Sequence, residues 1–206
     1  MSQQFDKYVK AAIPDRYTIF GVVLRPLSLG HLLLMKRHGC GFAEDKETNA
    51  ITVIDLLIAV AICSRKYQEF IDWYNDDDAR NSWLTKWYKS IRKESHKKGW
   101  ALMNKFSLFN MYRKEGIEVP LFFDEEENKD AAKESGAHWT QNIITALVTE
   151  GRFNDVEIYD IPISKAFAEY FKILENKGLI TLMPDWQIEE IKKQETIAKE
   201  LAINGK

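Results

Sequence analysis

The sequence predicts a mainly α protein, a compact helical domain with one small β element near the N-terminus. Three observations predict this class. Apolar residues recur at helical spacing over most of the 206 residues, a short run near residue 20 is rich in β-branched and aromatic residues, and glycines or capping residues stand at the ends of the periodic segments. Hydrophobic residues make up 45% of the chain, which is enough for a core without disulfides or metals.

The β element is predicted over Tyr17 to Leu24, with Gly21 inside it. We expect a strand or a small hairpin that turns near the glycine. Pro26 ends it because proline has no backbone N–H to donate. Ser28 is then the expected N-cap of a helix over Leu29 to His38.

The segment from Val53 to Cys63 is apolar on nearly every side, which predicts a helix in the centre of the core. Thr52 and Asp55 have the spacing of a capping box at its start. Ser64 is expected to cap the next helix, and residues 75–78 (NDDD) are expected to end that helix as a solvated turn.

From Ser82 to Glu115 the sequence predicts one long helix or two. Gly99 lowers the helical propensity in the middle, next to a polar stretch at 92–98 (RKESHKK) that holds no apolar residue. The segment 100–112 that follows is too apolar to be solvated on any broad face.

Composition changes divide the chain into three regions. Residues 1–123 form an N-terminal helical region with the short β element, and residues 124–137 form an acidic loop or linker. Residues 138–206 form a C-terminal helical region that can pack as one domain with the first.

Three helices are predicted in the C-terminal region. The first covers His138 to Thr149, the second is capped by Ser164 and runs to Asn176, and the third begins at Pro184. Because the third has a thin apolar face, we expect it to pack weakly or to extend from the body; this face consists of Ile188, Ile191, Ala198 and Leu201.

Charge and cysteine content argue against several classes of protein. A net charge of -2 gives no overall attraction to nucleic acid or anionic lipid. Cys40 and Cys63 are too few for a disulfide framework, and we expect both to be reduced thiols. Residues 1–10 are polar, unlike a signal peptide, and the longest apolar run, Ile51 to Cys63, is too short to span a bilayer. We therefore expect a cytoplasmic protein without a membrane anchor.

No motif for catalysis, a cofactor or a metal stands out. The four histidines (His31, His38, His96 and His138) lack zinc-binding spacing, and no Gly-rich phosphate loop or nucleophile elbow is present. His31 lies among leucines, where we expect a core histidine with a hydrogen-bonded ring. We expect a protein that is not an enzyme and has no cofactor; the alternative is an active site assembled from scattered residues.

The large share of aromatic residues, 12% of the chain, predicts a protein-binding surface as well as a core. Our candidates for that surface are Trp100, Met103, Phe106 and Phe109. The alternative is that all four belong to the core, and the binding face then moves to Ile188, Ile191 and Leu201 of the last helix. Whether the protein also forms homo-oligomers is left open.

A nucleic-acid-binding regulator is a further alternative. It would use a short basic segment with aromatic neighbours on which bases can stack; its cations are Arg92, Lys93, Lys97 and Lys98. The negative net charge and the small size of the segment make nucleic acid an unlikely partner.

Two stretches of the chain resemble a known family. They are Leu24 to Leu34 (LRPLSLGHLLL) and Trp139 to Gly178, in which Asp160-Ile161-Pro162 separates two helices. Both are similar to tail assembly chaperones of tailed bacteriophages, and residues 76–137 have no counterpart there. The resemblance implies a protein without catalytic residues that binds the long helical tape-measure protein in the host cytoplasm during virion assembly.

The mechanism that this resemblance implies is helix-in-groove binding, in which an apolar groove takes the amphipathic face of a partner helix. A structural virion component, such as a head–tail connector, is the alternative among proteins without catalysis.

Overall fold

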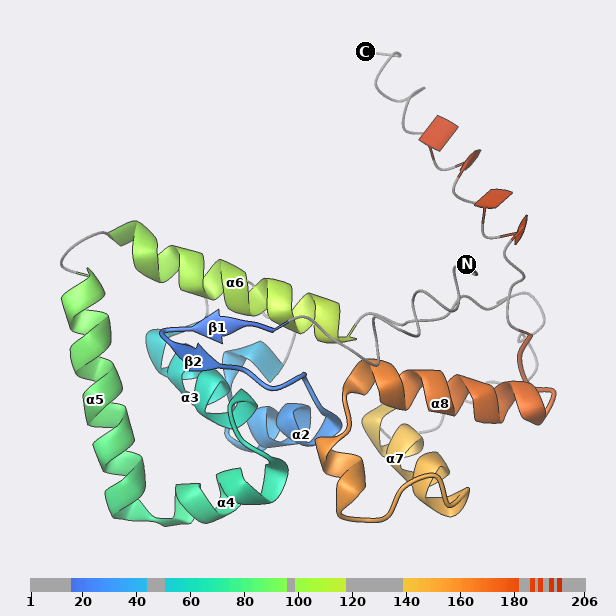
Figure 1. Ribbon diagram of the computed structural model, residues 1–206, viewed down its shortest axis with the longest axis horizontal. Helices are drawn as coiled ribbons and strands as arrows, with labels where there is room; N and C mark the ends of the chain where they lie inside the picture. The colour runs from blue at the N-terminus through green and yellow to red at the C-terminus, as the bar shows by residue number, and fades with distance from the viewer. Residues whose placement is uncertain are drawn as a thin grey trace.

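The computed structural model confirms the mainly α class. It describes residues 16–43, 51–95, 99–117 and 139–181 and four pairs near the C-terminus (186–187, 189–190, 193–194 and 196–197), without the side chains of 90–103. The elements of these ranges are β1 (Thr18–Ile19), β2 (Val22–Val23), α2 (Leu29–Arg37), the 3-10 helix η1 (Gly41–Ala43), α3 (Val53–Cys63), α4 (Tyr67–Asn75), α5 (Asp77–Ser95), α6 (Gly99–Ile117), α7 (Trp139–Thr149), the 3-10 helix η4 (Glu157–Asp160) and α8 (Ile163–Asn176) (Figure 1).

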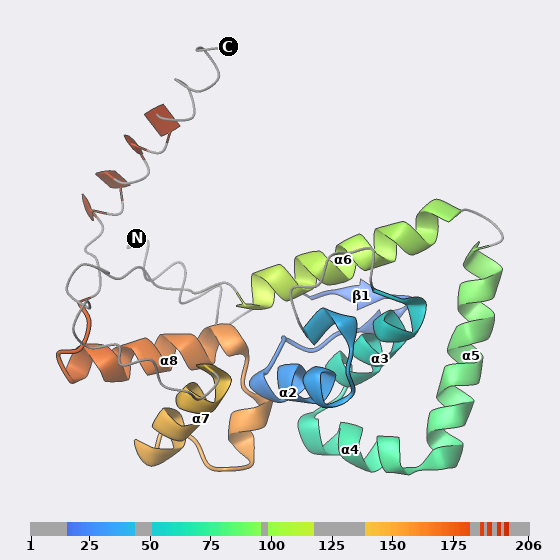
Figure 2. The same ribbon diagram turned by 180° about the vertical axis from the view of Figure 1, so that it is seen from behind.

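The helices surround α2 and α3, which lie in the middle of the molecule in both ribbon views (Figures 1 and 2). On one side, α4, α5 and α6 follow one another around the end of the molecule, and α5 forms its outer edge. On the other side lie α7, η4 and α8. The β-hairpin lies between α6 and α3, and β1 contacts α6.

The predicted β element is a two-stranded antiparallel hairpin with the turn at Gly21. Thr18 pairs with Val23 and Ile19 pairs with Val22. Phe20 and Gly21 have φ values of 53° and 76°. Positive φ at both central residues is the conformation that suits the twist of a two-residue hairpin loop.

The predicted N-caps of α2 and α3 are both present. Ser28 Oγ accepts a hydrogen bond from the backbone N–H of His31, and Thr52 Oγ1 accepts one from that of Asp55, each at 3.2 Å. The Asp55 carboxylate also accepts from the backbone N–H of Gly41 at 2.9 Å. The start of α3 is therefore fixed to η1 as well as capped.

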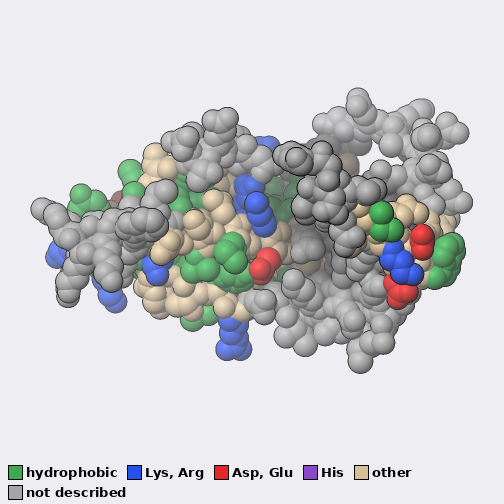
Figure 3. All heavy atoms as spheres, turned by 90° about the horizontal axis from the view of Figure 1, so that it is seen from above, with side chains coloured by type: hydrophobic (Ala, Val, Ile, Leu, Met, Phe, Trp, Pro, Cys, Tyr) green, Lys and Arg blue, Asp and Glu red, His purple; other side chains and the backbone are tan. Residues whose placement is uncertain are grey.

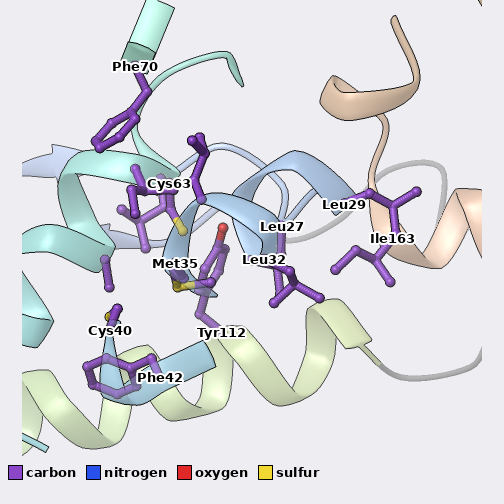
Figure 4. Packing of buried hydrophobic residues seen from close by; sticks show 14 of the residues in the cluster. Leu27, Leu29, Leu32, Met35, Cys40, Phe42, Cys63, Phe70, Tyr112 and Ile163 are labelled. Atoms are coloured by element: carbon purple, nitrogen blue, oxygen red, sulfur yellow. The ribbon is translucent and has the colours of Figure 1, made fainter. Parts of the chain in front are cut away.

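As predicted, α3 is the central core helix, with seven buried residues between Leu56 and Cys63. Side chains from α2, η1 and α6 converge on it, and Tyr112 of α6 points towards Met35 and Cys63 (Figure 4). The helix is not buried on every side, because Ile58 is half-buried and Ile54 is 67% exposed.

Near α4, the predicted N-cap is wrong, whereas the predicted end at residue 75 is confirmed but is followed by a shorter turn than expected. Ser64 does not cap α4; it is the C-cap of α3, and its Oγ donates to the carbonyl oxygen of Ala61 at 3.0 Å. Residues 75–78 are not a solvated turn, because Asp76 alone separates α4 from α5. The Asp76 carboxylate accepts from the backbone N–H of Ala79 at 3.0 Å, so that this aspartate starts the next helix.

The segment from Ser82 to Glu115 belongs to two helices and not to one, because α5 ends at Ser95 and α6 begins at Gly99. Trp83 and Trp87 of α5 face inwards. The Trp87 ring lies 5.0 Å from that of Phe20 and 5.2 Å from that of Trp83, between ring centroids. The hairpin turn and α5 are thereby packed together.

The C-terminal helices share the core of the N-terminal region. Ile143, Ile158 and Ile163 belong to the same buried cluster as the residues of α2 and α3. Ile163 N–H donates to the carbonyl oxygen of Leu27 at 2.9 Å. Helix α8 begins at Ile163 after Pro162, one residue before Ser164, the predicted cap, so that this cap is wrong.

The predicted acidic linker, residues 124–137, lies outside the described residues. For the last predicted helix, the four described pairs between 186 and 197 are helical, and Gln187 is their only residue that is not exposed.

Candidate partner-binding surface

Phe106 and Phe109 of α6 face inwards. Phe109 is fully buried, and its ring lies 4.5 Å from that of Phe42 and 5.4 Å from that of Tyr112, between ring centroids. Phe106 is half-buried and stacks on Phe42 at 6.2 Å. The predicted alternative of a core role therefore applies to Phe109, and we do not count it in a binding surface.

The register of α6 explains this placement. Phe109, Tyr112 and Gly116 follow one another at three- and four-residue spacing and face the core; a Cβ at position 116 would lie only 2.7 Å from the Leu27 Cβ. The opposite stripe is exposed and consists of Asn104, Ser107, Met111 and Lys114, of which Met111 is 54% exposed.

Trp100 and Met103, the other two predicted residues, lie in the described backbone of α6, but their side chains are not described. Position 100 comes four residues before Asn104 and eleven before Met111. By helical register it therefore falls on the outer stripe, and position 103 falls beside it.

The C-terminal segment presents apolar side chains to solvent. The predicted residues Ile188, Ile191 and Leu201 lie outside the described residues, but two neighbours are described, and both are exposed: Trp186 by 71% and Ile197 by 56%. They are eleven residues apart, about three helical turns, and Glu190 and Lys193, which stand between them at helical spacing, are exposed as well.

Sequence reasoning missed Trp186 and Ile197 because neither stands at helical spacing from Ile188 and Ile191, which defined the predicted apolar face. The eleven-residue spacing was the signal that could have found them.

The structure describes only part of the basic segment that binding of nucleic acid would use. Arg92 and Lys93 lie in the backbone of α5, whereas Lys97 and Lys98 lie outside the described residues. Trp87 is buried against Phe20. Trp87 therefore offers no free ring face on which a base could stack.

The buried polar side chains are held in neutral forms. His31 Nδ1 accepts from the Ser28 N–H at 3.2 Å, and Nε2 donates to the carbonyl oxygen of Arg65 at 2.9 Å, so the neutral ring carries its proton on Nε2. Burial lowers the pKa of His31 to about 4. Burial raises the pKa of Cys40 to about 11 and that of Cys63 to about 12. Both cysteines are free, as predicted, and as neutral thiols they are poor nucleophiles at pH 7.

Comparisons of the chain with protein-family models, curated proteins and solved structures gave no match. Within the residues that the structure describes, no group of three His, Cys, Asp or Glu side chains is placed to hold a metal ion. No helix of the described part of the chain is long and apolar enough to cross a membrane.

Proposed function

We propose that the protein is an assembly adaptor without catalytic activity, which binds a helical protein through an apolar face. The observation that carries this proposal is the exposure of Trp186 and Ile197, two large apolar side chains at helical spacing near the C-terminus. An exposed tryptophan is the side chain that gains most on burial at an interface, and tryptophan is enriched among the residues that dominate binding energy.

The binding mode that fits this face is the packing of two amphipathic helices. Glu190 and Lys193, four and seven residues after Trp186, are exposed at positions that share its side of a helix, so charged side chains stand between the two apolar ones. Charged groups within a binding face set the register and orientation of a partner more than they add affinity.

We further propose that the partner is the tape-measure protein of a tailed phage, and that the chain acts as its chaperone during tail assembly. The support is the family resemblance of Leu24–Leu34 and Trp139–Gly178. A long amphipathic tape-measure helix exposes apolar surface before the tail subunits enclose it, and an adaptor with an apolar face can cover that surface.

Co-expression with the tape-measure protein of the same genome tests this proposal. We expect a soluble complex that Trp186→Ala and Ile197→Ala each weaken by about 1 kcal/mol or more, with little change in the stability of the free protein. Met111→Ala, which removes an exposed apolar side chain from α6, is the matched control and should bind normally.

The outcomes separate the parts of the proposal. Failure to form any complex rejects the tape-measure partner. A complex that both C-terminal variants leave intact rejects the C-terminal face, and loss of binding in Met111→Ala moves the interface to the outer stripe of α6.

A further inference from the structure

The outer face of α5 combines separated charges with an exposed aromatic ring. Asp77 and Asp78 occupy the first turn and are exposed. Lys86 and Lys89, two turns and more further on, are also exposed, and Tyr88 between them is 63% exposed. The helix is therefore acidic at its start and basic in its second half.

Two of these charges, Asp78 and Lys89, lie on one stripe of the helix, whereas Asp77 pairs with Arg80 of the same helix. Trp83 and Trp87 define the inner side, and the residues opposite them, all exposed, are Asp78, Asn81, Ser82, Thr85, Tyr88 and Lys89. From position 78 to position 89 this stripe is about 16 Å long, at about 1.5 Å per residue. Position 92, an arginine, continues it by register.

Compensation of the helix dipole accounts for only part of this pattern. Acidic residues in the first turn stabilise any helix, and so do basic residues in the last turn. Lys86 and Lys89, however, lie nine and six residues before the end of α5 at Ser95. The dipole effect is confined to the final turn, so it does not explain why Lys89 stands on the same outward stripe as Asp78 and Tyr88.

We propose that this face of α5 binds the same face of a second copy of the chain, with the two helices antiparallel. A two-fold symmetric contact uses the same patch twice, so the patch must be complementary to itself. In the antiparallel arrangement the acidic start of each α5 faces the basic second half of its partner, and the two copies of Tyr88 bury apolar area near the small side chains of Asn81 and Ser82.

The position of α5 permits this contact. It forms the outer edge of the molecule in both ribbon views (Figures 1 and 2), and Lys and Arg side chains lie around this end in the view from above (Figure 3). Exposed ion pairs fix register and orientation more than they add affinity. We therefore expect a dimer that depends on concentration and on salt, and that leaves the C-terminal face proposed for the helical partner free.

Sedimentation velocity of the full chain tests the contact. In about 0.1 M salt the protein should show a concentration-dependent dimer, and the dimer should weaken in about 1 M salt, where the Debye length falls from about 10 to about 3 Å. Asp78→Lys replaces the acidic side chain of the stripe by a base, and Lys89→Glu replaces the lysine that would face it by an acid. Each variant alone should dimerise roughly tenfold or more weakly, and an equimolar mixture of the two should recover a heterodimer.

Tyr88→Ala should also weaken the dimer, and Lys36→Glu, a charge reversal on α2, is the control that should leave it unchanged. Circular dichroism and thermal melting verify that each variant folds. If Asp78→Lys does not fold, Tyr88→Ala and Lys89→Glu still test the contact. A chain that stays monomeric in low salt, or a dimer that these variants do not weaken, overturns the proposal. Two weakened variants that do not recover in the mixture overturn the antiparallel pairing.

Discussion

His31 connects three segments of the chain through a single residue. Its backbone N–H is capped by Ser28 Oγ, its Nδ1 accepts from the Ser28 N–H, and its Nε2 donates to the carbonyl oxygen of Arg65 between α3 and α4. Both ring nitrogens of His31 therefore have a hydrogen-bond partner. Protonation of Nδ1 would place two N–H groups against each other and would put a charge in a fully buried site.

We expect this ring to make the stability of the protein depend on pH. The unfolded imidazole takes up its proton near pH 6.5, but burial delays protonation in the folded protein to a pKa of about 4. Between these values the unfolded state binds more protons, so the free energy of unfolding is highest above pH 6.5 and falls as the pH drops towards 4. The loss is roughly 3 kcal/mol at about 1.36 kcal/mol per pKa unit.

Urea unfolding at several pH values between 7.5 and 4.5 measures this dependence, and His31→Gln isolates it from the titration of carboxylates. The variant should be less stable at neutral pH and should lose less stability on acidification than the parent. Parallel curves for the two proteins would show that His31 does not carry the effect.

At the scale of the element, α3 shows how an apolar helix divides between core and solvent. Ile62→Asp should unfold the protein or cost several kcal/mol, because it places an unpaired charge in the fully buried part of the helix. Ile54→Asp is the matched control. It puts the same charge on an exposed residue of the first turn, where the helix dipole favours an acid, and should change the stability by less than about 0.5 kcal/mol. Thermal melts of the two variants should differ widely, and similar melting points would contradict the central position of α3.

The elements that depend on local signals could be predicted from the sequence. The bounds of α3 and the caps of α2 and α3 follow from residues within four positions of each other. The start of α4 follows from them only in part: Glu69 accepts from the backbone N–H of Lys66 at 3.0 Å, but the backbone N–H of Tyr67 donates to the carboxylate of Asp160, 93 residues away, at 2.8 Å. No periodicity near residue 64 carries that information.

The candidate binding residues were harder to predict for a related reason. Residues 100–112 are apolar around most of the helix, so the pattern does not show which side meets the core. Packing against η1 and against Leu27 decides this, and it places Phe109 inside and Met111 outside. In a helix with a narrower apolar stripe, the sequence alone would have shown which side faces the core.

At the scale of the whole molecule, the N-terminal and C-terminal regions are joined where α2 meets η4. Gly30 of α2 packs directly on the chain at Tyr159, where a Cβ would lie 2.5 Å from the carbonyl oxygen of Tyr159 and 2.7 Å from the Tyr67 ring. The two tyrosine rings stack at 4.6 Å. Close approach, and not helix propensity, therefore explains the glycine inside this helix.

Gly30→Ala tests whether this junction holds the two regions together. Although alanine is the better helix former by about 1 kcal/mol, the added methyl group collides with backbone that cannot move away cheaply, and we expect a net loss of about 1–3 kcal/mol. Amide exchange should show the largest loss of protection in α7 and α8, with α3 least affected. Gly151→Ala is the control, since its Cβ would meet no atom within 4 Å and its cost comes only from a φ of 64°. It should lower the stability without selective exposure of α7 and α8. A Gly30→Ala protein as stable as the parent, or one that loses protection evenly across all helices, would show that the contact of α2 with η4 is not what docks the C-terminal helices.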